Sequence, residues 1–310
     1  MNDITVGIRS IGCYVPRSIR DSAWIARASD IPEPVIREKF GIKLIHKAGP
    51  DETVSSMGVE AAKRALNGMD PKELDMVVYC GSEYKDFYLF NCAAAIQHGI
   101  GATNAVVFEI HNLCSAGVWG LKVLKSMMLQ DPTLRKVLMV SSSKEGDLIN
   151  YKDSASRFMF NFGDGAAAVL LERDWKENVI LESAMIADGQ FARDVSVPGV
   201  GCQNFEDFDQ MAPGDKYLRV LDLQNMKERL DPITMGNFIS VVAQAADRSG
   251  FGRDHIDYLA PIFMKRSILA HLLEQFGLTE AQTYVLEEYG HCQSADCFIS
   301  LWEGERELES

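Results

Sequence analysis

The stretch VVFEIHNLCSAGVWGL at residues 106–121 places a cysteine between a strand pattern and a helix pattern. Its first five residues are mostly β-branched or aromatic, which predicts a buried strand that ends near His111. Small residues at 115–117 and at 120 then allow a close turn, and apolar residues continue at helical spacing from Val118. Cys114 is therefore expected where the strand gives way to a helix.

A cysteine at this position has two interpretations. A thiol at a helix N-terminus faces the positive end of the helix dipole and unpaired backbone N–H groups, so its thiolate is favoured and a developing oxyanion has donors nearby. Cys114 would then be an acyl-accepting nucleophile. A free cysteine also behaves as a small hydrophobe, so a buried structural thiol is the other interpretation, and this stretch alone does not decide between them.

The composition is that of a folded, acidic protein. The chain has 310 residues, of which 47% are hydrophobic and 24% charged, so it is long enough for one large domain or two fused domains. A net charge of −13 argues against nucleic acid or an anionic membrane surface as the main partner. An acidic carrier protein would need a local basic patch on which to dock.

The cysteine pattern predicts reduced thiols. Seven cysteines are scattered through apolar segments without the paired spacing of a zinc site, so no metal is expected and a cytoplasmic location fits best. The sequence has neither a signal-peptide pattern nor an apolar run of about 18 residues. We therefore expect a soluble, cytoplasmic chain with no membrane span.

Strand patterns alternate with helix patterns, which predicts an α/β fold with a parallel or mixed sheet. Ligands in such folds bind beyond the carboxyl ends of the strands, where Glu83 and Cys114 are both expected. Glu83 would suit a general base there, although a solvated or structurally paired glutamate is the alternative. The predicted strands cover residues 4–15, 75–80, 106–111 and 137–142, a run after Gly165, and residues 179–187, 257–260 and 283–286. The predicted helices cover residues 20–28, 53–66 and 92–100, a run after Cys114, and residues 231–249, 267–276 and 294–302, with irregular loops at 188–220.

Three segments together resemble a known family. They are ETVSSMGVEAA at residues 52–62, the turn at Cys114 and FGDGAAAVLLE at residues 162–172, in this order and spacing. They are similar to the thiolase superfamily, and within it to the beta-ketoacyl-acyl-carrier-protein synthase III family, with 3-hydroxy-3-methylglutaryl-CoA synthase as a cousin. The resemblance implies two related βαβαβ halves, residues 1–173 and 174–310, in a five-layered α-β-α-β-α arrangement. It also implies a homodimer and an acylated Cys114.

The sequence departs from that family at its catalytic histidine. The family pattern Pro-His-Gln-Ala-Asn matches a stretch that begins at Pro261, so Ile262 stands where the histidine would be. Alignment to the hydroxymethylglutaryl-CoA synthases through Phe263 and Lys265 puts Ala260 there instead. His271 lies farther along a predicted helix and is expected to be packed or exposed rather than catalytic.

A histidine instead replaces the family's asparagine. The pattern His-Gly-Asn-Thr matches residues 289–292, with His291 at the asparagine. An imidazole there can deprotonate the thiol or hydrogen-bond a thioester oxygen. Glu83 resembles the glutamate of the hydroxymethylglutaryl-CoA synthases, which is a general acid/base in a condensation without decarboxylation. The resemblance thus implies that Cys114, His291 and Glu83 surround one pocket.

Further expectations concern substrate binding. Phe87 matches the position from which a synthase III subunit reaches its partner's acyl pocket, and Ile262 with Phe263 is expected to line the substrate site. Val35 replaces the tryptophan that stacks on CoA adenine in well-known members. The family has a further strand pair and a glycine-rich loop beyond the position of Ser310, so we expect the natural chain to continue.

The function implied is acyl transfer in fatty acid or polyketide biosynthesis. Cys114 would accept an acyl group from the phosphopantetheine thioester of CoA or of a carrier protein and then condense or transfer it, with no tightly bound cofactor. One alternative is a hydroxymethylglutaryl-CoA-synthase-like condensation that uses Glu83. Another is a non-catalytic partner of an active paralogue, suggested by Ile262 but opposed by the retention of Cys114.

Overall fold

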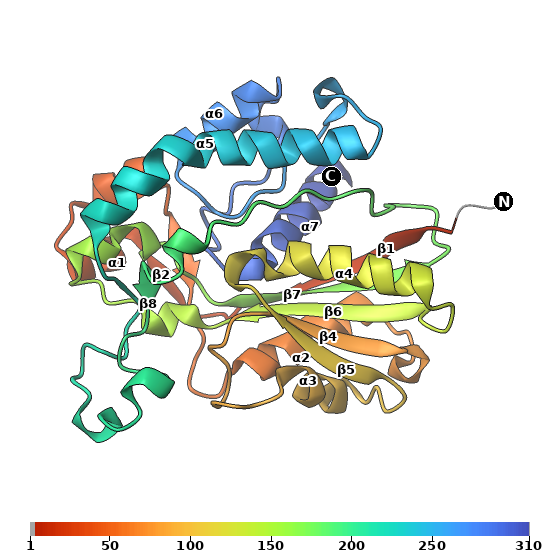
Figure 1. The fold of residues 1–310 in the computed structure, drawn as a ribbon, viewed down its shortest axis with the longest axis horizontal. Helices are drawn as coiled ribbons and strands as arrows, with labels where there is room; N and C mark the ends of the chain where they lie inside the picture. The colour runs from red at the N-terminus through yellow and green to blue at the C-terminus, as the bar shows by residue number, and fades with distance from the viewer. Residues whose placement is uncertain (1–3, 310) are drawn as a thin grey trace.

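The computed structural model describes residues 4–309 and is organised around one mixed sheet (Figure 1). Its strand order is β1-β7-β6-β4-β5. Strand β4 pairs in parallel with β5 and β6, whereas β7 pairs antiparallel with β6 and β1. The strands are β1 (Val6–Tyr14), β4 (Met76–Gly81), β5 (Val106–His111), β6 (Lys136–Ser143) and β7 (Gly165–Arg173).

Helices cover both faces of this sheet. In Figure 1, α2 (Val54–Leu66) and α3 (Cys92–Ile100) lie below it, and α4 (Ala116–Gln130) and α7 (Asp296–Glu309) lie above it. Helices α5 (Leu223–Arg248) and α6 (Arg266–Gln275) form an outer layer above α4 and α7. The remaining elements are α1 (Ser22–Ser29) and two short sheets, β2 (Ile19–Asp21) with β3 (Leu44–His46) and β8 (Val195–Ser196) with β9 (Arg219–Val220).

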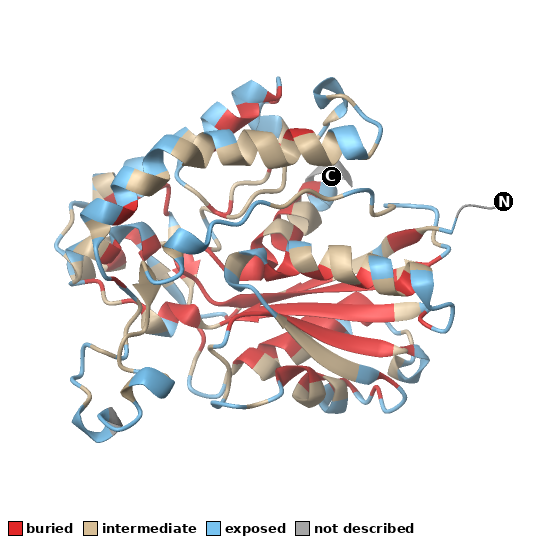
Figure 2. Ribbon diagram, viewed as in Figure 1, coloured by how far each residue is buried: buried red, intermediate tan, exposed pale blue. Residues whose placement is uncertain are grey.

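The central strands are buried on both faces. This packing holds in place the strand ends that carry the site. All six residues of β4 are buried and alternate between two cores, as the pleat requires. Val78 and Cys80 belong to the core under α4 and α7, whereas Val77 and Tyr79 belong to the core over α2 and α3. Figure 2 shows these strands as a buried layer between the helices.

The first half of the chain confirms most of its predicted elements. Helix α3 covers the predicted residues 92–100, and β1, β4, β6 and β7 lie where strand patterns were found. The prediction of a buried strand at 106–111 is wrong in one respect. Strand β5 is the edge of the sheet and pairs only with β4, so Val106 is 59% exposed.

The second half forms its predicted helices but not its predicted strands. Helix α5 begins at Leu223 rather than at 231, because Asp222 caps it by accepting the backbone N–H of Asn225, and it contains Pro232. Residues 179–187, 257–260 and 283–286 form no strand in the structure described. Leu259 donates its N–H to Gln282 O at 2.9 Å, and Val179 forms a single bridge with Gly7. Apolar patterns indicate extended backbone, but a ladder also needs an aligned partner.

Residues 188–220 are irregular as predicted, apart from β8, β9 and short helical turns. Within residues 4–309, no helix is long and apolar enough to cross a membrane. Over the same residues, no three His, Cys, Asp or Glu side chains are grouped so as to hold a metal ion.

Candidate active site

Cys114 lies in the turn between β5 and α4. The backbone N–H of Asn112 donates to Gly81 O at 3.1 Å, which ties the end of β5 to the end of β4. The short helical turn η3 (Leu113–Ser115) follows and leads into α4, and Leu113 has the left-handed φ of 50°. Cys114 is thus half-buried at the N-terminal end of α4, as the sequence predicted.

His291 reaches the same place from the second half of the chain. Its backbone N–H donates to Asn161 O at 2.6 Å, and its carbonyl accepts the N–H of Gly163 at 3.1 Å. The approach is so close that a Cβ on Gly163 would lie 2.5 Å from Tyr289 O, and Gly290 has a φ of 83°. The glycines of the FGDG and YGH segments therefore hold His291 against the main sheet.

The structure brings Cys114 and His291 together and adds an aspartate. Cys114 Sγ lies 3.1 Å from His291 Nε2, and His291 Nδ1 lies 2.5 Å from Asp296 Oδ2. Asp296 is fully buried and also accepts the backbone N–H groups of Cys292 at 2.6 Å and Phe263 at 2.7 Å. The three side chains form a continuous Cys-His-Asp chain of polar contacts.

The electrostatics of this chain favour a proton on the imidazole. Burial lowers the pKa of His291, but the Asp296 carboxylate and the Cys114 sulfur outweigh burial and hold that pKa well above its usual value. Imidazolium beside sulfur stabilises a thiolate. The arrangement is therefore suited to nucleophilic attack by Cys114.

Glu83 lies in the loop after β4 and contacts the end of β5. Its Oε1 forms an ion pair with His111 Nδ1 at 2.7 Å while the side chain remains 74% exposed. Within residues 4–309 the ion-pair partner of Glu83 is this histidine, three positions before Cys114, and neither Cys114 nor His291. The acid/base role suggested by the sequence stays a prediction.

The other predicted binding residues differ in their surroundings. Phe263 is buried in the main core, and its backbone is fixed through Asp296 and through Asn161, whose Nδ2 donates to Phe263 O at 3.3 Å. Ile262 beside it is half-buried. Phe87 is 72% exposed in the loop after β4 and stacks edge-on with Phe90.

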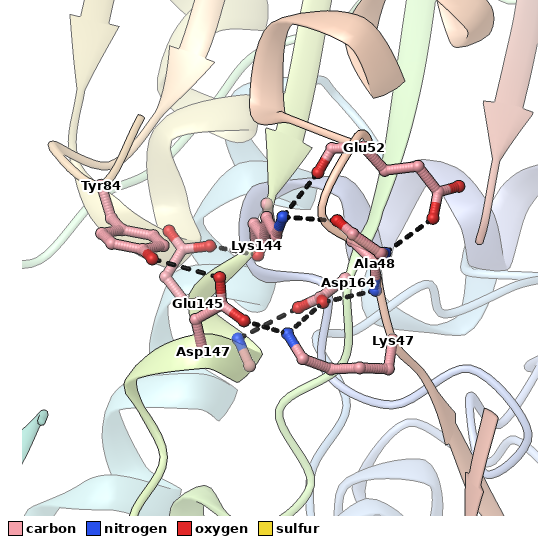
Figure 3. Close-up of polar contacts among 11 residues, drawn as sticks. Lys47, Ala48, Glu52, Tyr84, Lys144, Glu145, Asp147 and Asp164 are labelled. Atoms are coloured by element: carbon pink, nitrogen blue, oxygen red, sulfur yellow. Dashed lines mark hydrogen bonds and ion pairs between the residues drawn. The ribbon is translucent and has the colours of Figure 1, made fainter. Parts of the chain in front are cut away.

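A buried polar network holds the neighbouring strand ends together (Figure 3). Lys47 Nζ lies 2.5 Å from Asp147 Oδ1 and 2.6 Å from Asp164 Oδ2, and Tyr84 donates to Asp147 at 3.2 Å. Burial raises the pKa of Asp164 although Lys47 opposes the shift. Since Asp164 belongs to the FGDG turn, the network fixes the loop against which His291 lies.

Glu145 joins the same network to the loop that carries Glu83. Its carboxyl is fully buried and accepts the hydroxyls of Ser82 and Ser143. Burial raises the pKa of Glu145, and the two hydroxyls oppose that shift. Ser82 directly precedes Glu83. The position of Glu83 therefore depends on this buried contact.

Two residues of the site were not predicted from the sequence. Asp296 contacts His291, and Gln293 contacts Cys114, whose Sγ lies 2.7 Å from Gln293 Oε1. The available signal was their spacing: polar residues two and five positions after His291 precede an apolar run, where a helix N-terminus was expected. That signal places them near His291 but does not show which atoms they touch.

Comparison with known proteins points to one family. The profile described as 3-Oxoacyl-[acyl-carrier-protein (ACP)] synthase III matches residues 108–189, and that of its C-terminal part matches residues 246–309. A beta-ketoacyl-[acyl-carrier-protein] synthase III from Caldanaerobacter subterraneus is 26% identical over 306 residues, which cover 98% of this chain and 90% of the relative. In both comparisons the chain is similar to the beta-ketoacyl-acyl-carrier-protein synthase III family.

Further relatives agree with this assignment. The synthase III of a Sulfurovum species is 31% identical over 205 residues, 65% of this chain and 59% of the relative. The crystal structure of the synthase III from Aquifex aeolicus has a TM-score of 0.83 at 21% identity and covers 98% of this chain and 92% of that one. The fold is thus thiolase-like, and this chain is a synthase III-like acyltransferase.

Proposed function

We propose that this protein carries an acyl group on Cys114 and transfers it to a hydroxyl or amine through a Cys114–His291–Asp296 relay. The observation that supports this most is the buried Asp296 carboxylate, 2.5 Å behind His291 Nδ1. A carboxylate in that position holds Nδ1–H toward itself, which turns Nε2 toward the sulfur and stabilises the imidazolium. Cys114 would come from the half at residues 1–173 and its two partners from residues 174–310.

The first half-reaction loads the cysteine. His291 Nε2 takes the Sγ proton, and the sulfur attacks the carbonyl carbon of an acyl thioester of CoA or of a carrier protein. The thioester C–S bond of the donor breaks, and its thiol leaves with the proton from His291. The Cys114 backbone N–H at the start of α4 is a donor for the oxyanion formed between these events.

The second half-reaction unloads it. The acceptor O–H or N–H gives its proton to His291 Nε2 while its oxygen or nitrogen attacks the carbonyl carbon of acyl-Cys114. The Cys114 sulfur leaves as a thiolate beside the imidazolium, so the Cys114–His291 pair again holds the one proton with which it began. Asp296 is a positioning residue in both halves, because it contacts His291 and not the acyl group.

The family suggests a second candidate, decarboxylative condensation with a malonyl thioester. That reaction develops an enolate, which needs hydrogen-bond donors. Ile262, where the family resemblance puts a histidine, has no side-chain donor. A histidine backed by a carboxylate is a better base for an acceptor hydroxyl than a donor to an enolate, so we favour transfer to a heteroatom.

The partners implied are a thioester donor and a second copy of the chain. Strand β5 leaves one edge unpaired, and the neighbouring loop exposes Phe87 and Leu89 at 72% and 92%. Solvent exposure of an open strand edge beside large apolar side chains favours pairing with another chain. We propose that two copies associate through this edge.

Intact-protein mass spectrometry tests the loading step. Incubation with a panel of acyl-CoA and acyl-carrier thioesters should add one acyl group to the unmodified protein and none to Cys114→Ala. Cys202→Ala, which removes an exposed cysteine outside the site, is the matched control and should load normally. Equal loading of Cys114→Ala would refute the proposed nucleophile.

A further inference from the structure

Gln293 approaches the Cys114 sulfur from a second side. Its Oε1 lies 2.7 Å from Sγ, while His291 Nε2 lies 3.1 Å from the same atom. Gln293 is only 5% exposed. One thiol is therefore in contact with two buried polar groups, and the relay described above uses only the histidine.

The backbone holds the glutamine in place. Gln293 has a φ of 56°, in the left-handed region that non-glycine residues rarely occupy. On one side Ser294 donates its hydroxyl to Cys80 O at 2.8 Å, and on the other Cys292 donates its N–H to Asp296 at 2.6 Å. Left-handed backbone fixed from both sides is typical of residues that are positioned for function.

The protons available decide which end of the carboxamide faces the sulfur. A thiol has one hydrogen, and a carboxamide has donors at nitrogen and acceptors at oxygen. Asp296 requires a proton on His291 Nδ1, so a neutral imidazole accepts the Sγ proton at Nε2. The sulfur then has no hydrogen left for Gln293 Oε1. In the alternative state, imidazolium beside thiolate, the sulfur has none at all.

A third state, imidazolium beside a neutral thiol, would leave Sγ–H free to donate to Gln293 Oε1, but a neutral thiol is not the attacking species. The thiolate that attacks therefore requires Gln293 to donate. Nitrogen and oxygen of a carboxamide have nearly the same shape and are told apart by their hydrogen-bond partners. A 180° rotation of the amide puts Nε2 where Oε1 stands, at the sulfur. We propose that Gln293 is a catalytic residue that donates an amide N–H to the Cys114 sulfur and stabilises its negative charge.

This donor would act at two moments of the reaction. The sulfur carries negative charge before it attacks the donor thioester, and again when it leaves the acyl group after transfer. A hydrogen bond to the charged form favours both events. The inference rests on Cys114 being the nucleophile, as proposed above, but it concerns the ionisation of the thiol and can be measured without any acyl substrate.

The experiment is alkylation of Cys114 by iodoacetamide as a function of pH, followed on the Cys114 peptide by mass spectrometry. In Gln293→Leu the midpoint should move to higher pH by roughly half to one unit, as expected for a lost hydrogen bond of about 1 kcal/mol. In Gln293→Glu it should move farther, because a carboxylate repels the thiolate. Exposed Cys202 in the same samples is the internal standard, and Gln275→Leu on the surface of α6 is the matched control.

The outcomes separate this inference from the proposed function. The donor role is supported if the pH midpoint of Cys114 alkylation rises from the unmodified protein to Gln293→Leu and again to Gln293→Glu. An unchanged midpoint in folded Gln293→Leu overturns it. If the leucine variant does not fold, Gln293→Met, which keeps the length of the side chain and removes the amide donor, decides in its place: no upward shift overturns the inference. Failure of the acyl loading assay on unmodified protein would instead count against the proposed function.

Discussion

His291 is held between a carboxylate and a sulfur, and this single residue links the two halves of the chain. The Asp296 carboxylate compensates for the burial of the His291 ring. The pKa of His291 is therefore raised although the ring is removed from solvent. Asp296 in turn is stabilised by two backbone N–H groups. The chemistry of the site therefore depends on a carboxylate that contacts no substrate.

Asp296→Asn tests this dependence. Loss of the negative charge should lower the pKa of His291, because the Cys114 sulfur alone then opposes the effect of burial, and proton binding at the Cys-His pair weakens. We expect acyl loading to slow by up to about 10⁴, the loss seen when the aspartate of a serine protease triad is replaced by asparagine, and its pH profile to move to lower pH. Single-turnover loading followed by mass spectrometry across pH measures both effects.

A surface pair supplies the control for this prediction. Asp254 Oδ1 lies 3.2 Å from His255 Nδ1 with both side chains exposed. Asp254→Asn breaks the same kind of contact away from the site and should leave loading unchanged. A loading rate for Asp296→Asn within twofold of the unmodified protein would contradict the relay.

The sequence predicted part of this site and missed the rest for a physical reason. Cys114 and His291 were recognisable because each follows an extended segment, Cys114 in the family's turn and His291 at the position of the family's asparagine. Asp296 and Gln293 were not, because their roles depend on how the turn after His291 folds back on it. The left-handed backbone at Gln293, which aims its side chain at Cys114, has no signature in residue type.

At the scale of elements, the site depends on the contact between α4 and the turn that precedes α7. A Cβ on Gly117, in the first turn of α4, would lie 2.7 Å from Ser294 O and 2.6 Å from the Phe298 ring. Ser294 is adjacent to Gln293. The glycine therefore allows the His291 segment to reach the helix that begins beside Cys114.

Gly117→Ala should separate these elements. The added methyl must push the Ser294 backbone away, so we expect a lower melting temperature, with a loss of stability of about 1–3 kcal/mol, and slower acyl loading. Gly236→Ala is the matched control, because its Cβ in α5 meets nothing within 4 Å. That variant should be more stable by about 0.5–1 kcal/mol and load normally. Normal loading and stability of Gly117→Ala would show that the contact is not needed.

Elements with local signals were predictable from the sequence, and those set by long-range pairing were not. Helix α3 has a capping Asn91 at its start and Gly101 at its end, and its bounds match the prediction. Strand β5 has a buried-strand pattern but lies at the sheet edge, since residue type does not specify neighbours. The same limit explains why residues 257–260 and 283–286 form no strand in the part of the chain that the structure describes.

At the scale of the whole molecule, the open edge at β5 predicts self-association. Sedimentation should give a species of twice the chain mass of 34.5 kDa at micromolar concentration. The double variant Phe87→Asp, Leu89→Asp should be monomeric, because it puts charge in the proposed interface. Phe205→Asp, at a comparably exposed phenylalanine outside this edge, should still dimerise. A monomeric unmodified protein would contradict the proposed interface.

The central claim is that acyl-Cys114 is attacked by a heteroatom rather than by an enolate. The most direct measurement loads the protein with a labelled acyl group, offers hydroxyl and amine acceptors together with a malonyl thioester, and follows acyl transfer and carbon dioxide release in one reaction. We predict transfer to oxygen or nitrogen with slow carbon dioxide release, and faster release in Ile262→His. Rapid carbon dioxide release with formation of a carbon–carbon bond by the unmodified protein would contradict the account.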